Sequence, residues 1–296
     1  MSDQNEAASE PSAGGNPKRI WPTLLAALLT PVFAALQVGT GLELLAPGRE
    51  PQSLIATPLI GFVGLGLLQL SFILCSLLVA QFSREEPGDR LATRWPHVAP
   101  LSILILALAA YGVDMLTSTL GAPLLPNLDD SAAHLDALLQ PSSGWIRVGL
   151  IAIIVVVTPL ATELFCRGLL LHGLLRRLAP VAAILLTACL FVLPLGEWQG
   201  QLLALPLGLY LGAVAYRTRS IWPGVFGQIY LSLVPVLDAV LPEPLKTTLM
   251  RPQGVWSVFD YAGAIALPLA CWLLWRGVAL RERESDLTSG EKSAAS

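Results

Sequence analysis

The stretch that decides the fold runs from Pro159 to Arg177 and reads PLATELFCRGLLLHGLLRR. It places Glu163 and Arg167 four residues apart inside an apolar run that begins near Val148. Residues at i and i+4 share one face of a helix, so this carboxylate and this guanidinium can pair. Ionisable side chains are costly inside a membrane unless they pair or serve a site. The stretch therefore predicts a membrane-spanning helix that carries a charged pair.

The composition of the whole chain also predicts a membrane protein. Of its 296 residues, 54% are hydrophobic and 13% are charged, whereas a soluble domain carries roughly 25% charged residues. So few polar groups cannot cover the surface of a soluble protein of this length. The formal net charge of -3 disfavours nucleic acid as a partner. The four cysteines do not have the spacing of metal ligands. All four lie in apolar segments, and burial in lipid-facing helices disfavours a disulfide framework.

Eight apolar segments are long enough, or nearly so, to cross a bilayer about 30 Å thick. They lie near residues 20–42, 57–81, 98–121, 148–175, 180–195, 200–216, 221–241 and 257–275. We therefore expect an all-α polytopic membrane protein with about eight transmembrane helices in residues 18–283. The polar ends, residues 1–17 and 284–296, predict disordered tails. The first apolar segment is longer than the core of a cleaved signal, which favours an uncleaved anchor, although cleavage stays an alternative.

Lys and Arg are distributed unequally between the two sides of these segments. If the N-terminus is cytoplasmic, 13 of the 18 Lys and Arg residues fall on the cytoplasmic side and four on the other, with one inside a span. The four are Arg49, Arg147, Lys246 and Arg251, and the one inside a span is Arg167. Cytoplasmic loops are enriched in Lys and Arg, so we predict that both termini are cytoplasmic.

Three motifs follow one another between residues 148 and 241. The first is Thr162–Gly168, the second is a span that ends with Phe191–Leu195, and the third begins with Gly208–Gly212 and continues through Tyr216–Pro223. In order and spacing this segment resembles the CPBP family, which includes the type II CAAX prenyl endopeptidases, bacteriocin-processing enzymes and Abi proteins. The resemblance implies a CPBP-like helical core, and it points to a bacterial inner membrane.

The resemblance also implies where catalytic residues would lie. Family members that cleave peptides are thought to use a glutamate of the first motif, histidines of the second and third, and an asparagine four residues later. These positions are occupied here by Thr162, Leu195, Gln228 and Ser232. None of these side chains acts as a base without an activating partner. We therefore predict no intact catalytic residue, no metal site and no cofactor, although family enzymes can use a metal.

The remaining candidates for acid–base chemistry are few. Of the three histidines, His97 begins the third span and His134 lies in a predicted external loop. His172 follows Glu163 by nine residues, which is about 180° around an α-helix and thus the opposite face. Glu163 itself has two interpretations. It is either the structural partner of buried Arg167 or a surviving base or ligand, and the first is favoured because such pairs persist for structural reasons alone.

Three functional hypotheses follow. The leading one is a CPBP-like membrane protein without proteolytic activity that binds a hydrophobic or lipidated peptide or a partner membrane protein in the bilayer. The alternative is an active endopeptidase with a rearranged site in which Glu163 is the base. The second alternative is a small transporter, for which Asp114 in the middle of a span is the candidate residue. The absence of inverted repeats in the sequence weighs against the transporter.

Overall fold

The computed structural model describes most of the chain after residue 57. The described residues are 58–81, 87–96, 98–121, 135, 138–139, 142, 144–193, 198–242, 244–246 and 257–294, with side chains described up to Arg276 in the last helix. The predicted N-terminal tail 1–17 and the first expected span 20–42 lie outside these residues. All regular structure in the described part is helical, which confirms the prediction of an all-α fold.

The described helices succeed one another along the chain from α3 to α14. Their bounds are α3 Pro58–Gln81, α4 Pro87–Arg90, α5 Pro100–Gly121, α7 Gly144–Ala152, η2 Ile153–Val157, α8 Thr158–Glu163, η3 Leu164–Leu171, α9 His172–Leu174, α10 Pro180–Val192, α11 Trp198–Thr218, α12 Trp222–Val240 and α14 Val258–Ala294. The elements from α7 to α9 form one uninterrupted helical run, Gly144–Leu174, in which η2 and η3 are π-helical.

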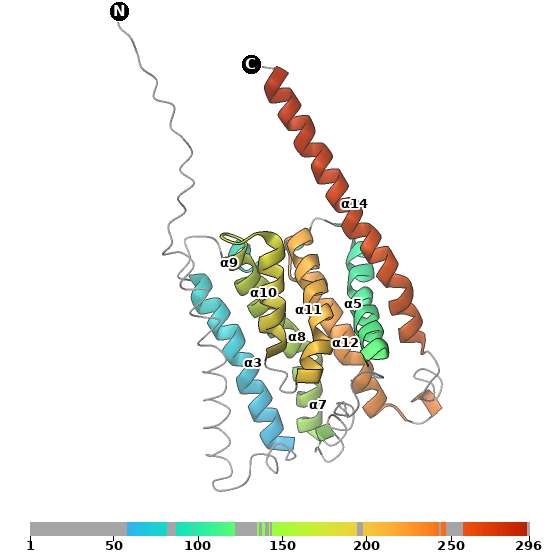
Figure 1. Cartoon of the computed structure of the whole chain (residues 1–296). Helices are drawn as coiled ribbons and strands as arrows, with labels where there is room; N and C mark the ends of the chain where they lie inside the picture. The colour runs from blue at the N-terminus through green and yellow to red at the C-terminus, as the bar shows by residue number, and fades with distance from the viewer. Residues whose placement is uncertain are drawn as a thin grey trace, which may run out of the picture.

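Five described helices are long and apolar enough to cross a membrane. They are Pro58–Gln81, Pro100–Gly121, Gly144–Leu174, Trp222–Val240 and Val258–Arg276. The polytopic membrane fold expected from the sequence is thus confirmed. Two expected spans fall short of these criteria: α10 has 13 residues, and α11 carries Gln199, Gln201 and Arg217 near its ends. Both nevertheless lie within the bundle beside the longer helices (Figure 1).

Helix α5 packs against α14, α12 and α11, whereas α3 packs against the η3 and α8 part of the long run. The crossing of α5 and α14 is close, because a Cβ atom added at Gly112 would overlap the backbone of Gly263. Two hydrogen bonds reinforce this half of the bundle. Tyr210 Oη donates to Leu106 O at 2.7 Å, and Tyr111 Oη donates to Asp260 Oδ1 at 2.9 Å.

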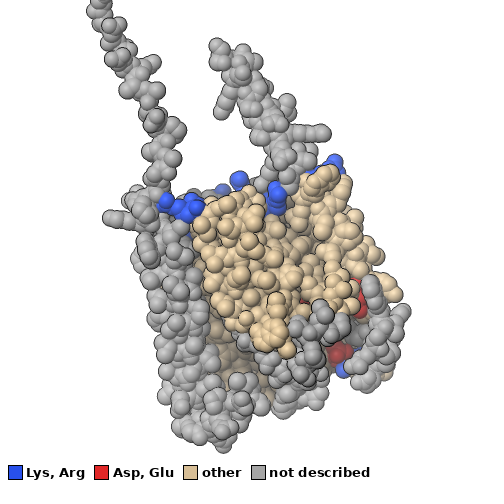
Figure 2. Space-filling model, in the orientation of Figure 1, with Lys and Arg blue, Asp and Glu red and all other residues tan. Residues whose placement is uncertain are grey.

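The sides of the bundle are apolar and its ends are charged. Large hydrophobic side chains such as Leu101, Val181 and Ile265 are more than 60% exposed, as expected where lipid replaces water as the solvent. Figure 2 shows Lys and Arg gathered at the end of the bundle from which α14 projects. This end includes the chain segments after α4, α9 and α11, each of which carries arginines.

The last helix differs from the sequence expectation. Residues 284–296 were expected to form a disordered tail, but α14 continues as helix to Ala294. Its apolar part ends at Arg276, and the residues that follow include Leu, Arg and Glu, which have high helix propensity. A helix that is already nucleated within the bundle can extend through such residues at little cost.

Candidate functional site

The first motif lies in the middle of the long helical run, where the helix changes its geometry twice. The run is π-helical from Ile153 to Val157, α-helical through α8, and π-helical again from Leu164 to Leu171. π-helical turns are rare and occur frequently at functional sites. Pro159 stands at the start of α8. Because proline has no N–H to donate, it lies where the hydrogen-bond pattern of the helix changes, and the helix continues through it.

Glu163 ends α8 and Arg167 lies in the second π-helical stretch. Glu163 Oε1 and Arg167 Nη1 are 2.8 Å apart, and both side chains are 0% exposed. A buried charge without a partner is strongly destabilising, so each of these groups requires the other. The structure therefore brings together the two residues that the sequence spacing placed on one face.

Arg167 also contacts two further helices. Its Nη2 atom donates to the backbone oxygen of Gly208 in α11 at 3.3 Å. Its guanidinium carbon lies 4.3 Å from the centre of the Phe191 ring in α10. A guanidinium over an aromatic face is stabilised by the ring quadrupole, and more so away from water. Arg167 thus connects the long run to both helices of the second and third motifs.

Helix α12 supplies the third partner of this cluster. The Gln228 Nε2 atom donates to Glu163 Oε1, and Gln228 is itself buried. One turn earlier, a Cβ atom at Gly224 would overlap Glu163 Oε2. Only glycine lets α12 approach the carboxylate this closely. Glu163, Arg167 and Gln228 form what we call the buried cluster.

The other motif positions lie apart from these contacts. Thr162 is half-buried, and its hydroxyl donates to Thr158 O in its own helix at 2.7 Å. Ser232 is half-buried one turn after Gln228 in α12. Leu195 lies outside the described residues. Of the four positions that correspond to catalytic residues in the family, only Gln228 makes a described contact with Glu163.

The histidines do not join the buried cluster in the described part of the chain. His97 and His134 lie outside the described residues. The His172 Nδ1 atom is 2.6 Å from the backbone oxygen of Arg167, and the ring lines a separate pocket at the basic end of the bundle. His172 therefore interacts with the backbone of the cluster helix and not with the Glu163 carboxylate.

The donors around the buried cluster do not fit a metal ion. Within the described residues, no group of three or more His, Cys, Asp or Glu side chains is placed to hold one. Glu163 is the single carboxylate of the cluster and is already paired with a guanidinium. Thr162, Gln228 and Ser232 stand where the family has a glutamate, a histidine and an asparagine, and their side chains are weaker ligands for a transition metal.

Asp114, the candidate for the transporter hypothesis, lies in α5 and is partly buried. Thr117 Oγ1 donates to the backbone oxygen of Asp114 at 3.0 Å. This is a local contact within one helix. The described contacts connect Asp114 with neither the buried cluster nor the pocket at the basic end.

Comparison with known proteins gives one match, to the part of the chain that holds the buried cluster. Residues 144–234 match the family model described as Type II CAAX prenyl endopeptidase Rce1-like. The resemblance to the CPBP family is thereby confirmed. The Rce1-like segment covers α7 to most of α12 and includes every residue of the buried cluster. No curated protein and no solved structure matches the chain.

Sequence reasoning missed two residues of this site. Gly224 allows the approach of α12, and its signal was a glycine one turn before Gln228 on the same face. Phe191 was quoted as part of the second motif, but its contact with Arg167 was not anticipated. The two π-helical stretches had no recognisable signal, because their apolar sequences also suit an α-helix.

Proposed function

We propose that the protein retains a CPBP-type helical scaffold without cleaving peptide bonds, and that it binds a hydrophobic or lipidated peptide or a partner membrane protein. The observation that carries this proposal is that the Glu163 carboxylate is buried and held by two neighbouring side chains. Its Oε1 atom is engaged by both Arg167 and Gln228, and its side chain is 0% exposed. A general base must reach the water that it activates and must be free to accept its proton.

The contacts of the buried cluster favour a structural role for it. The cluster connects the long helical run with α10, α11 and α12. These are the elements that hold all three family motifs. A charged pair that joins several helices keeps its residues even where catalysis is absent. Retention of Glu163 and Arg167 is therefore compatible with a scaffold that only binds.

The competing function is an endopeptidase in which Glu163 activates water. It requires an open path to the carboxylate and release of the Gln228 amide. In the described structure Glu163 Oε2 has no hydrogen-bond partner, so this oxygen is the one atom through which such chemistry would proceed. A single experiment with a conservative variant separates the two functions.

The experiment uses the full chain in lipid nanodiscs and a farnesylated peptide with a free C-terminal carboxylate. Wild type and Glu163→Gln are compared, with and without added Zn²⁺. Mass spectrometry detects cleavage, and equilibrium binding is measured with a fluorescent form of the same peptide. We expect saturable binding by both proteins and cleavage by neither. Cleavage by wild type that Glu163→Gln abolishes would overturn the proposal. A lack of peptide binding would contradict its peptide-binding part.

We further propose that the protein lies in a bacterial inner membrane with both termini in the cytoplasm. The support is the excess of Lys and Arg on one side of the spans and their position at one end of the bundle (Figure 2). Fusion of a fluorescent protein or of alkaline phosphatase to the C-terminus tests this orientation. We expect fluorescence and no phosphatase activity, and the opposite pattern would refute it.

A further inference from the structure

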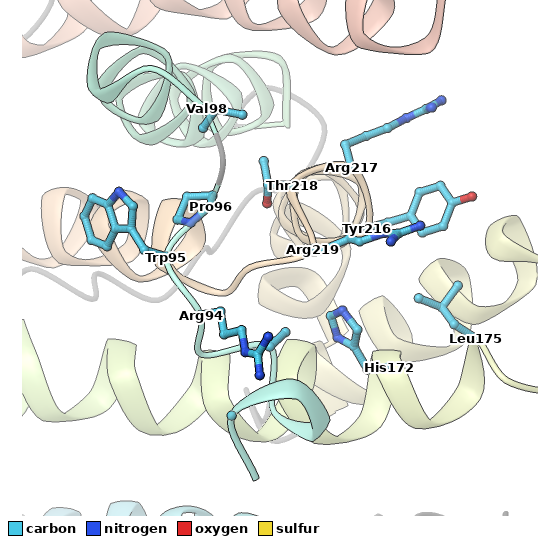
Figure 3. A pocket seen from close by; sticks show the side chains of 12 residues that line it. Arg94, Trp95, Pro96, Val98, His172, Leu175, Tyr216, Arg217, Thr218 and Arg219 are labelled. Carbon is cyan, nitrogen blue, oxygen red and sulfur yellow. The ribbon is translucent and has the colours of Figure 1, made fainter. Parts of the chain in front are cut away.

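A second polar region lies at the basic end of the bundle. It is a cavity of about 640 Å³ between the segment after α4, the end of the long helical run and the end of α11 (Figure 3). Its polar lining consists of Arg94, His172, Tyr216, Arg217, Thr218 and Arg219. We call this cavity the basic pocket. Three guanidinium groups and no carboxylate belong to its described lining, which suits an anion.

The walls of the basic pocket come from two distant segments that hydrogen bonds hold together. Ser220 Oγ donates to Arg94 O at 2.8 Å, and Trp222 Nε1 donates to Thr93 O at 2.7 Å. The backbone N–H of Ile221 donates to Ala92 O at 3.0 Å. In Figure 3 the side chains of Arg94 and His172 approach the pocket from one side, and Thr218 and Arg219 lie on the other. The arginines are therefore carried on a fixed frame.

The same frame holds two residues in an unfavourable backbone conformation. Ala92 has φ 51° and Arg219 has φ 52°, and both line the pocket. They are the non-glycine residues with positive φ in the described part of the chain. This left-handed region costs an L-residue roughly 1–2 kcal/mol. Such residues persist where the surrounding structure imposes them, and they cluster at ligand sites.

An apolar groove adjoins the basic pocket. It has a volume of about 380 Å³ and lies between α5 and α12, and Trp95 belongs to the lining of both cavities. The groove is lined by hydrophobic side chains, among them Ile103, Leu104, Phe226 and Leu233. From Pro100 to Leu108 it follows α5 for roughly 12 Å, at 1.5 Å per residue. A cationic pocket therefore continues into an apolar groove that runs along the membrane-spanning helices.

Aromatic rings mark the junction between pocket and groove. The Trp95 ring lies 6.0 Å from that of Trp222 and 6.1 Å from that of Phe226. Tryptophan prefers the headgroup level of a bilayer, where its apolar ring and polar N–H both find suitable surroundings. The junction is thus placed at the depth where a lipid changes from headgroup to acyl chain.

From this arrangement we infer that the protein binds one anionic phospholipid. Its phosphate lies between Arg94 and Arg219, and one acyl chain lies in the groove between α5 and α12. Basic pockets beside membrane-spanning helices are suited to such headgroups because the guanidinium matches the phosphate in charge and geometry. A free phosphate ion would make no use of the groove, and a zwitterionic lipid gains less from the arginines. The inference does not depend on the proposed function, because it involves neither Glu163 nor peptide binding.

The test measures lipid binding to the full chain in neutral detergent by native mass spectrometry. The probes are phosphatidylglycerol, phosphatidylcholine with the same acyl chains, and inorganic phosphate. The pocket variant is Arg94→Gln combined with Arg219→Gly, because glycine suits the positive φ of position 219. Its control is Arg276→Gln in α14, where the guanidinium lies 5.1 Å from the Trp272 ring and does not line the pocket.

We expect one phosphatidylglycerol to bind in preference to phosphatidylcholine. An arginine at a membrane surface contributes about fivefold to the affinity for an anionic lipid. The pocket variant loses two arginines and should therefore bind phosphatidylglycerol about thirtyfold more weakly. Arg276→Gln should bind like wild type. Equal binding of the two lipids would overturn the inference. Displacement of phosphatidylglycerol by inorganic phosphate would also overturn it, because it would identify a site for a free anion.

A second pair of variants tests the groove. Leu104→Trp replaces an aliphatic side chain of the groove lining with a larger indole ring. Leu101→Trp makes the same change at an exposed position outside the groove. We expect Leu104→Trp to weaken binding of phosphatidylglycerol by at least threefold and Leu101→Trp to leave it unchanged. If both variants bind like wild type, no acyl chain occupies the groove and the inference is wrong.

Discussion

The buried cluster and the basic pocket both include residues of the long helical run, but their arginines differ in exposure and in neighbours. In the cluster, Arg167 is 0% exposed and lies against a carboxylate, a backbone oxygen and an aromatic ring. In the pocket, Arg94 and Arg219 are exposed, and no carboxylate belongs to the described lining. His172, which lines the pocket, is five residues from Arg167.

The difference follows from the surroundings of each region. The Glu163 and Arg167 side chains are fully buried, so each charge must be matched inside the protein. At the end of the bundle, solvent and anionic lipid can balance a cation. The same residue type therefore connects helices inside the bundle in one region and lines an open cavity in the other. The following predictions test this contrast.

The largest effect is expected in the buried cluster. Arg167→Met leaves Glu163 buried without its counter-charge, and we expect a loss of about 3–5 kcal/mol in the free energy of unfolding. Reversible unfolding in mixed micelles measures this loss. The double variant Glu163→Gln/Arg167→Met should be more stable than Arg167→Met alone, because no buried charge remains. A double variant as unstable as the sum of both single variants would contradict the pairing.

A smaller effect is expected where α12 approaches the cluster. Gly224→Ala would place a methyl group against Glu163 Oε2, and we expect a loss of about 1–3 kcal/mol in the free energy of unfolding from overpacking. Gly64→Ala in α3 is the matched control, since nothing lies within 4 Å of a Cβ atom there. If both variants unfold alike, the close approach of α12 does not contribute to stability.

The frame of the basic pocket should respond more weakly. Trp222→Phe retains a ring but removes the N–H that donates to Thr93 O at 2.7 Å. We expect a cost of about 1 kcal/mol, together with faster amide hydrogen exchange in residues 91–96. Trp198→Phe changes an exposed ring and should leave this exchange unchanged. Equal protection in both variants would show that the frame does not depend on this hydrogen bond.

The smallest effect is expected for glycine substitutions at positions 217 and 219, which should change the free energy of unfolding in opposite directions. Arg219→Gly relieves a positive φ, and we expect a gain of about 0.5–1 kcal/mol in the free energy of unfolding. Arg217→Gly lies within α11, where glycine is a poor helix former, and should lose about 0.5–1 kcal/mol. The same unfolding measurement compares them. A loss at both positions would show that the side chain of Arg219 stabilises the fold more than its backbone strains it.

Much of the fold could be read from local patterns. The five helices that can cross a membrane each lie on an expected apolar segment, because length and hydropathy are sufficient to define a span. The spacing of Glu163 and Arg167 was also sufficient to place them on one face. The ends of α10 and α11 were less certain, since their shorter or more polar sequences give a weaker signal. The helical continuation of α14 was not expected.

The partners of the site could not be read in the same way. The resemblance assigned Gln228 to the position of a family histidine, but it did not predict the hydrogen bond with Glu163, which joins residues 65 positions apart. The frame of the basic pocket likewise joins Arg94 to Ser220, which are 126 positions apart. No local periodicity encodes such distances. They depend on how helices cross, and thus on small residues such as Gly224 that permit close approach.

The sequence by itself determined that this protein is a helical membrane protein with a charged pair in one span and arginines at the ends of others. The physical reason is that hydropathy and helical spacing act over neighbouring residues. Only the tertiary structure decided that the pair is closed off by α10, α11 and α12, and that two distant segments place Arg94 and Arg219 around one cavity. Those arrangements arise from packing between helices, which brings together residues that the chain itself keeps far apart.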